Sequence, residues 1–218
     1  MAPLQSRFFP FLLRHQGVFH EVILVNANSS ALPIPRELLP RLRVVASSAG
    51  RGLQLDVGAR AAQADWYLFL HSDTTLCGPW QNAITNHLAQ RPNRPAVFRL
   101  TYDVRSSRAA FVGRWAGLRT RVFGLPYGDQ GLLISAECYR AVGGFNRAYP
   151  LMEDVDMIRR LGGRGAFDVL DAAACTSFAK YEQEGWLRRG MRNGWYYSLY
   201  RLGMSPRDLY GRYYRSHR

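Results

Sequence analysis

The fold is decided by the stretch GRGLQLDVGARAAQADWYLFLHSDT, which covers residues 50–74. Within it, the pattern predicts a helix over Leu53–Ala62 and a buried strand over the aromatic and aliphatic run Trp66–Leu70. The strand runs directly into a polar cluster, His71–Thr75. A helix followed by a short apolar strand is typical of α/β proteins, in which helices cover a mostly parallel sheet.

Two apolar runs upstream extend the same pattern. Glu21–Val25 and Arg43–Ala46 are short and apolar, and they predict two more strands. The first of them ends in the polar turn Asn26–Ser30. Ligands of open α/β sheets bind beyond the carboxyl ends of the strands. Because Asn26–Ser30 and His71–Thr75 both follow strands, we expect a binding site at this edge of the sheet.

The remaining sequence continues the alternation of helices and strands. Further helices are predicted over 8–13, 80–90, 105–121 and 136–142, and further strands over 96–102, 132–135 and from 167 onward. No internal repeat and no linker interrupts the sequence. We therefore expect one domain over residues 1–179, followed by a helical extension over residues 180–218.

The composition is that of a protein with an ordinary packed core. Hydrophobic residues make up 47% of the 218 residues and charged residues 21%, which excludes a disordered, collagen-like or low-complexity chain. The three cysteines form no Cys-x-x-Cys pair, so we expect free thiols in a reducing cytosol and no structural zinc. Because no run of about 20 apolar residues occurs, no membrane span is predicted.

Net charge is the unusual feature of the composition. The 29 basic and 16 acidic residues give +13, and every basic residue except Lys180 is an arginine. One interpretation is codon bias in a GC-rich genome. The other is an anionic partner, such as a nucleotide phosphate, a nucleic acid or an acidic membrane face. The planar guanidinium group suits phosphate because it donates two parallel hydrogen bonds.

Two groups of acidic residues are candidates for chemistry. Asp73 follows a buried strand, where its carboxylate is well placed to hold Mg²⁺ or Mn²⁺, with His71 as a further ligand. Glu153 and Asp154 open a predicted helix, where one of them is suited to act as a general base. The structural alternatives are a turn cap for Asp73 and complements to the helix dipole for the acidic pair.

Two glycine-flanked loops are further candidates. Asp129 and Gln130 lie between glycines ahead of a predicted strand, which is typical of a turn or of a contact to an acceptor or a pyrophosphate. Gly50-Arg51-Gly52 precedes a predicted helix and would bring Arg51 and backbone donors onto a phosphate. A single Gly-x-Gly pattern is a weak signal compared with a full dinucleotide fingerprint.

Taken in order, these motifs resemble those of glycosyltransferase family 2, the nucleotide-sugar transferases with the GT-A fold. Within that family they are similar to a small bacterial subgroup of radical-SAM/selenodomain-associated transferases. The resemblance extends over about residues 9–214, and its most specific parts are residues 50–59, 68–74 and 150–154. It implies an α/β fold of GT-A type and a hexosyltransferase activity. Such an enzyme moves a sugar from a nucleotide-diphosphate donor to an acceptor hydroxyl.

The resemblance implies a role for each candidate residue. Asp73 and His71 match positions that hold a divalent metal, Mn or Mg, which offsets charge on the departing diphosphate. Asp154 matches the catalytic base of an inverting displacement without a covalent sugar intermediate, with Glu153 beside it. The other matches are the donor-binding residues Asn26, Asn28, Arg51, Gln54 and Asp73, and the acceptor-side residues Asp129 and Gln130.

Two departures from the family pattern concern donor binding. Family members begin with a strand ending in Pro-x-x-Asn-Glu, and residues 1–7 are too few and too polar to replace it. We therefore expect an N-terminally truncated sheet, in which backbone groups of both neighbouring strands lack partners. The turn Asn26–Ser30 also carries amides where the family carries an acid. The alternative function is a catalytically impaired member that acts as a binding or scaffold protein at a membrane surface.

The extension is basic and rich in aromatic residues. Residues 180–218 contain nine basic and three acidic residues, which is +6 of the total charge. This pattern predicts either a helix pair packed on the sheet, or a membrane-surface helix whose arginines meet anionic lipid. The membrane interpretation suits a lipid-linked acceptor and a cytoplasmic protein at the inner face of the membrane. Nucleic-acid binding is a third alternative, for which the sequence contains no known motif.

Overall fold

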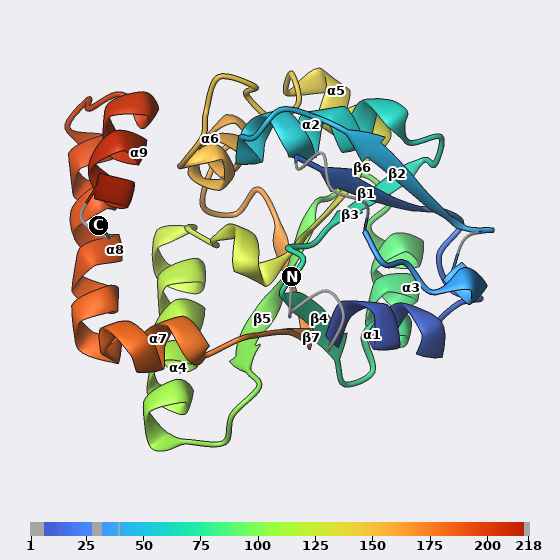
Figure 1. Ribbon diagram of the computed structural model, residues 1–218, viewed down its shortest axis with the longest axis horizontal. Coiled ribbons are helices and arrows are strands. Elements are labelled where there is room, and N and C mark those ends of the chain that lie inside the picture. The colour runs from blue at the N-terminus through green and yellow to red at the C-terminus, as the bar shows by residue number, and fades with distance from the viewer. Residues whose placement is uncertain (1–6, 28–31, 39, 216–218) are drawn as a thin grey trace.

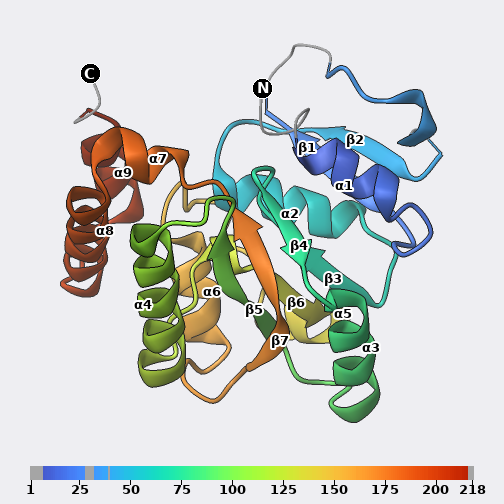
Figure 2. The same ribbon diagram turned by 90° about the horizontal axis from the view of Figure 1, so that it is seen from below.

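A computed structural model describes residues 7–27, 32–38 and 40–215, and in this part of the chain the strands form two sheets (Figures 1 and 2). The smaller sheet is a parallel pair, β1 with β2. The larger sheet has the strand order β3-β6-β5-β7-β4. The bounds of the strands are β1 Val22–Asn26, β2 Leu42–Ala46, β3 Trp66–Phe69, β4 Thr74–Cys77, β5 Ala96–Tyr102, β6 Leu132–Ser135 and β7 Asp168–Thr176.

The larger sheet is mixed. Within it β5 and β7 run parallel, whereas β3 with β6, β5 with β6, and β4 with β7 are antiparallel. The predicted α/β class is confirmed, with a mixed sheet in place of a mostly parallel one. One source of the difference is β4, which begins within the predicted polar cluster His71–Thr75. Thr74 is fully buried in β4, because β-branched side chains pack well on a sheet.

Helices cover both faces of the larger sheet (Figure 2). Successive side chains of a strand point to opposite faces. Phe98 and Leu133 accordingly pack with α1 and α3, whereas Val97 and Ile134 pack with α2, α5 and α6. The bounds of these helices are α1 Phe9–Arg14, α2 Arg51–Ala61, α3 Trp80–Gln90, α5 Ala136–Ala141 and α6 Glu153–Arg160.

The β1–β2 pair is separate from the larger sheet. Every residue of β1 and of β3 is partly exposed, whereas every residue of β6 is buried. Within the described part of the chain, no strand pairs with the outer edge of β3 or with the edge of β1 that faces away from β2.

The C-terminal helices pack on the rest of the molecule. The rings of Phe111 in α4 and Trp186 in α8 are 5.5 Å apart, and α4 and α8 lie side by side in Figures 1 and 2. Tyr196 of α8 and Leu209 of α9 form a small core with Leu151, just ahead of α6. Among the described helices, none has the length and apolarity needed to cross a membrane. The remaining bounds are α4 Ser107–Phe123, α7 Ala179–Glu184, α8 Trp186–Arg201, α9 Pro206–Arg215, and the 3₁₀ turns η2 Arg36–Leu38 and η3 Gly128–Gln130.

Candidate active site

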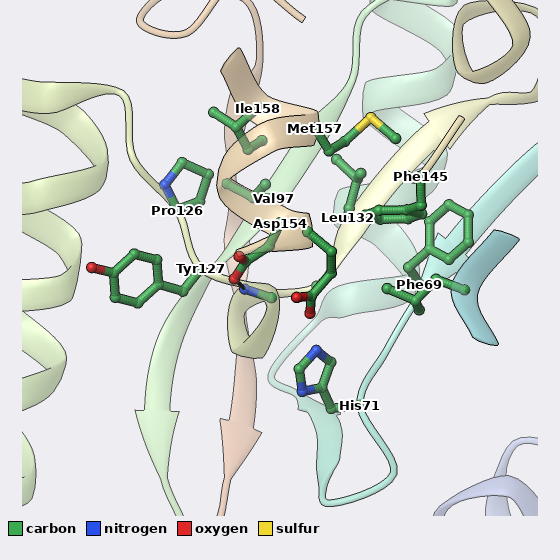
Figure 3. A pocket seen from close by; sticks show the side chains of 14 residues that line it. Phe69, His71, Val97, Pro126, Tyr127, Leu132, Phe145, Asp154, Met157 and Ile158 are labelled. Carbon is green, nitrogen blue, oxygen red and sulfur yellow. Dashed lines mark hydrogen bonds between the residues drawn. The ribbon is translucent and has the colours of Figure 1, made fainter. Parts of the chain in front are cut away.

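The acidic pair of the sequence lies at the N-terminus of α6. Met152, directly ahead of the pair, has a φ of 65°, a left-handed conformation that is uncommon for a residue with a side chain. Met152 packs against the core formed by Tyr196 and Leu209, and this contact supports the strained turn. The turn places Glu153 and Asp154 in the wall of the pocket shown in Figure 3.

Two backbone amides anchor the Asp154 carboxylate. The N–H of Gly128 donates to Oδ2 at 2.6 Å, and the N–H of Val155 donates to Oδ1 at 2.7 Å. A Cβ atom on Gly128 would lie 2.6 Å from Nε2 of His71 and 3.5 Å from Oδ2 of Asp154. Gly128 is therefore the residue that allows His71 and Asp154 to approach each other, and both line the pocket in Figure 3.

Glu153 is a buried carboxyl group without a partner. It is 1% exposed, and within the described residues neither of its oxygens has a hydrogen-bond partner. Burial, together with the charge of Asp154, raises the pKa of Glu153 to about 8, although Arg51 opposes the rise. The group is therefore protonated at neutral pH and able to donate a hydrogen bond. An unsatisfied buried group is better explained by a ligand site than by a complement to the helix dipole.

Asp129 belongs to the same electrostatic environment. Burial raises its pKa to about 6 against the opposing charge of Arg119, and the charges of Asp154 and Asp73 add to the rise. Its Oδ1 is buried and has no hydrogen-bond partner in the described part of the chain. The carboxylates of three separate sequence motifs are therefore close enough to influence one another.

Gln130 differs from its predicted place on the acceptor side. The residue is fully buried. Its Oε1 accepts hydrogen bonds from Thr120 Oγ1 at 2.8 Å and Arg119 Nη2 at 3.3 Å, and its Nε2 donates to the C=O of Phe98 at 3.0 Å. Because its amide is bonded inside the protein, Gln130 holds the loop in place, and Asp129 is the member of the pair with an unsatisfied oxygen.

His71 and Asp73 supply the ligand types expected of a small metal site. Burial and the charge of Arg51 lower the pKa of His71 more than Asp73 and Asp154 raise it, so the imidazole is held in its neutral, metal-binding form. Across the residues that the structure describes, no group of three or more His, Cys, Asp or Glu side chains is arranged to hold a metal. A cation held by this pair would need substrate phosphates to complete its coordination.

An open cavity adjoins this pocket. The cavity has a volume of about 720 Å³, and Arg51, Gln54, Asp73 and Lys180 line it near His71. His71 lines both the cavity and the Asp154 pocket. The structure thus brings the predicted donor side and the predicted catalytic side together at His71.

The other donor-side candidates do not line the cavity, lie outside the described residues, or are hydrogen-bonded within the protein. Asn26 ends β1, where its C=O accepts from the N–H of Ser47 at 3.0 Å, and it is not among the residues that line the cavity. Asn28 lies outside the described residues. The N–H of Gly52, expected to face a phosphate, donates to the C=O of Tyr149 at 3.2 Å. The side chain of Arg51 is therefore the phosphate candidate of the Gly-Arg-Gly motif.

Two residues of the site were not selected from the sequence. Lys180 of α7 lines the cavity, and its charge contributes to the lowered pKa of His71. The signal that could have identified it is its status as the single lysine in a chain rich in arginine. Tyr127 lines the pocket and packs under Arg119, whose Cζ lies 3.5 Å from the ring centroid. The sequence around Tyr127 contains no comparable signal that would have identified it as a residue of the site.

Solved structures resemble this chain in fold. The mannosyltransferase PcManGT from Pyrobaculum calidifontis, in complex with GDP-Man and Mn²⁺, matches with a TM-score of 0.57 and 17% identity over 94% of this chain and 63% of that chain. GalNAc-T7, with UDP, GalNAc and Mn²⁺, matches with a TM-score of 0.52 and 10% identity over 77% of this chain and 39% of that chain. No protein-family model and no curated protein sequence matches the chain.

The similarity defines the class of fold. This chain has the α/β architecture of the GT-A nucleotide-sugar transferases. It spans less than two thirds of the length of either neighbour, and at 10% and 17% identity the similarity concerns the fold alone.

Proposed function

We propose that this protein is a glycosyltransferase that moves a sugar from a nucleotide-diphosphate donor to an acceptor hydroxyl. The observation that carries the proposal is the position of His71, which lines both the cavity with Arg51 and Asp73 and the pocket with Asp154. A donor bound in the cavity would present its sugar at His71, close to a carboxylate base. The structures of GalNAc-T7 and PcManGT, which contain Mn²⁺ with UDP or GDP-Man, support a donor of this kind.

Asp154 is the proposed base of an inverting displacement. The acceptor oxygen forms a bond to the anomeric carbon while its proton passes to Asp154. The bond between that carbon and the diphosphate oxygen breaks, and its electron pair leaves with the nucleoside diphosphate. Attack opposite the leaving group inverts the anomeric configuration. The amides of Gly128 and Val155 hold the carboxylate in position for this transfer.

The donor diphosphate requires positive charge, which the cavity wall supplies. Arg51 and Lys180 both line the cavity near His71. Arginine binds phosphate through its planar fork, and lysine acts as a compact point charge. His71 and Asp73 would hold Mn²⁺ or Mg²⁺, and such a cation neutralises charge on the leaving diphosphate when bound.

Glu153 and Asp129 are assigned to substrate hydroxyls. Glu153 is protonated at neutral pH because its pKa is raised to about 8, and it is therefore a hydrogen-bond donor within the pocket. Asp129, with an unsatisfied buried oxygen, is the remaining acceptor-side candidate. A sugar or an acceptor hydroxyl in the pocket would satisfy Glu153, whereas Asp129 does not line the pocket or the cavity.

An anionic membrane is the proposed environment of the acceptor. α4 and α8 each contain four arginines and no acidic residue. Large apolar side chains are exposed on both helices, including Trp115 at 52%, Trp195 at 63% and Met191 at 70%. Apolar side chains with arginines are suited to the headgroup region of an acidic bilayer. Contact through α8 would place a lipid-linked acceptor and the protein at the cytoplasmic face of the membrane.

The alternative is a membrane-surface binding or scaffold protein without transfer activity. The separate β1–β2 pair favours this alternative, because Gln54 of the donor side is bonded to β1 through the C=O of Val25. A donor site attached to a strand with one partner is held less rigidly than a site attached to a strand that is paired on both sides.

Ligand-dependent unfolding separates the two functions. A UDP- or GDP-sugar with Mn²⁺, at about 100 times its dissociation constant, should raise the melting temperature by about 5–10 °C. Asp73→Ala should remove this shift, whereas Asp154→Asn should keep the shift and lose transfer. If no nucleoside diphosphate stabilises the protein, the binding or scaffold function replaces the transferase.

A further inference from the structure

Two cysteines that are distant in the sequence are neighbours in the structure. Cys77 ends β4 and Cys175 lies near the end of β7, and these strands run antiparallel, side by side in Figure 2. Cys175 lies opposite Thr75, two residues before Cys77, so the two cysteines are diagonal neighbours on one face of the sheet. The Cys77 thiol donates a hydrogen bond to the sulfur of Cys175. Both are partly exposed free thiols.

The surroundings of Cys175 favour its thiolate form. Nη2 of Arg7 donates to the Sγ of Cys175 at 3.4 Å, and Nη1 of the same guanidinium group pairs with Asp103 at 2.8 Å. The hydrogen bond from Cys77, together with the charge of Arg7, lowers the pKa of Cys175 to about 6. Burial and the charge of Asp103 act against this shift. The thiolate, which is the nucleophilic form of cysteine, therefore predominates at neutral pH.

The other two cysteines have the opposite character. The hydrogen bond to Cys175 and burial raise the pKa of Cys77, so this thiol keeps its proton. Burial and the charge of Glu137 raise the pKa of Cys138, which lies in α5. An accessible thiolate beside a second, protonated thiol is typical of cysteines that sense oxidants. Cys138 is a thiol of the same chain without this arrangement, and it serves as an internal reference.

We propose that Cys77 and Cys175 form a site of reversible oxidation by peroxides, and that the product is a disulfide between β4 and β7. The Cys175 thiolate attacks one peroxide oxygen, so an S–O bond forms, the O–O bond breaks, and the second oxygen takes up a proton and leaves as water. The Cys77 sulfur then attacks the Cys175 sulfur. An S–S bond forms, the S–O bond breaks, and the hydroxyl group leaves as water with the Cys77 proton.

The diagonal position of the two cysteines makes this disulfide easy to reduce. Diagonal neighbours across two strands have Cα atoms roughly 7–8 Å apart, whereas disulfides usually join Cα atoms about 4.4–6.8 Å apart. The bond therefore draws β4 toward β7. Among the described strands β4 pairs with β7 alone, so it can shift without losing another partner strand. A strained disulfide has a higher reduction potential, which is why glutathione should reduce it.

Alkylation of the wild-type thiols tests the proposed nucleophile. The full-length protein is treated with iodoacetamide over a range of pH, and peptide mass analysis follows each cysteine. At about pH 6, Cys175 should react about tenfold or more faster than Cys138, because only Cys175 contains a substantial fraction of thiolate. Its rate should level off above about pH 7, whereas the rate at Cys138 should continue to rise toward about pH 9. Equal rates at about pH 6 would overturn the proposal.

Treatment with hydrogen peroxide tests the product. The wild type should lose two of its three free thiols and yield an intramolecular cross-linked peptide that contains Cys77 and Cys175. Glutathione should then restore all three thiols. A cross-link that includes Cys138, oxidation of Cys175 without any cross-link, or a cross-link that glutathione leaves intact would overturn the proposal. These measurements on the wild type decide the question even where a variant does not fold.

Two serine variants separate the roles of the cysteines. Cys77→Ser keeps a hydrogen-bond donor beside Cys175 and removes the second sulfur, so peroxide should leave a sulfenic acid at Cys175 that dimedone traps. Cys138→Ser is the matched control and should form the disulfide at the wild-type rate. Absence of the dimedone adduct from folded Cys77→Ser would show that Cys175 is not the nucleophile. No sugar donor or metal is used, so the outcome is independent of the proposed transferase function.

Discussion

The larger sheet and the β1–β2 pair differ in how completely their strands are paired. β6 lies between β3 and β5 and is buried at every position, whereas β1 pairs with β2 alone among the described strands and is partly exposed along its length. Asp154 is attached to the interior of the larger sheet, because its carboxylate is held by the loop that leads into β6. Gln54, on the donor side, is attached to the open edge of β1.

This difference indicates where the molecule is rigid and where it is easily deformed. A buried strand with partners on both sides opens only with the global unfolding of its core, whereas an edge with one partner opens at lower free energy. We therefore expect changes at the catalytic side to act on chemistry, and changes at the donor side to act on binding.

Asp154→Asn should have the largest effect on activity. The substitution removes the proposed base and keeps the size of the side chain, so transfer from a UDP- or GDP-sugar should fall by about 10²–10⁴. Donor binding, measured by calorimetry, should be unchanged because Asp154 lines the pocket and not the donor cavity. The matched control is Asp156→Asn on the same helix, since Asp156 is paired with Arg160 at 2.9 Å and does not line the pocket. If Asp154→Asn loses no more activity than Asp156→Asn, Asp154 is not the catalytic base.

Gly128→Ala should reduce activity by about 10–100-fold by displacing side chains that the wild type holds close together. The added methyl group would lie 2.6 Å from Nε2 of His71, so either the imidazole or the loop has to move. The control is Gly117→Ala in α4, where a Cβ meets nothing within 4 Å. That variant should keep full activity and gain about 0.5–1 kcal/mol of stability, measured by urea unfolding. A fully active Gly128 variant would show that His71 and Asp154 do not need this approach.

The catalytic half of the site was more readily predicted from the sequence than the donor half. Glu153 and Asp154 open a helix as predicted and both line the pocket, whereas their catalytic role stays a prediction. The burial of Gln130 could not be inferred, because it depends on partners in other elements, Thr120 in α4 and Phe98 in β5. Lys180 reaches the cavity through the packing of α7, which no local pattern indicates.

The α/β class followed from the alternation of elements, whereas the antiparallel pairing of β3 with β6 depends on tertiary packing.

Lys180 should be protected from acetylation by a bound donor by about tenfold, because a diphosphate in the cavity would cover its ammonium group. The chain contains one lysine, so amine-directed acetylation followed by peptide mass analysis reports on this site alone. The α-amino group, which reacts with the same reagent, is the internal control and should be unaffected by UDP or GDP with Mn²⁺. Equal rates at Lys180 with and without the nucleotide would place the diphosphate elsewhere.

Glu153→Gln should stabilise the protein increasingly from pH 5 to pH 8. The pKa of Glu153 is raised from its ordinary value of 4.5 to about 8, so between these values the folded protein holds a proton that the unfolded chain releases. Stability of the wild type therefore falls as the pH rises through this window, and glutamine removes that dependence. The gain at pH 8, measured by urea unfolding without nucleotide or metal, should be on the order of a few kcal/mol. Glu137→Gln, at an exposed position, should leave the pH dependence parallel to that of the wild type.

Removal of two exposed tryptophans should have the smallest effect on the isolated protein and a measurable effect on membrane binding. Trp115→Ser with Trp195→Ser should reduce flotation with anionic vesicles several-fold, because each buried aromatic side chain contributes roughly 1–3 kcal/mol. Both residues are more than half exposed, so the melting temperature should change little. Val44→Ser, at 43% exposure on β2, is the control and should float like the wild type. If the wild type floats equally with neutral and with anionic vesicles, the arginines of α4 and α8 do not contribute to membrane binding. The contact then depends on the apolar side chains alone.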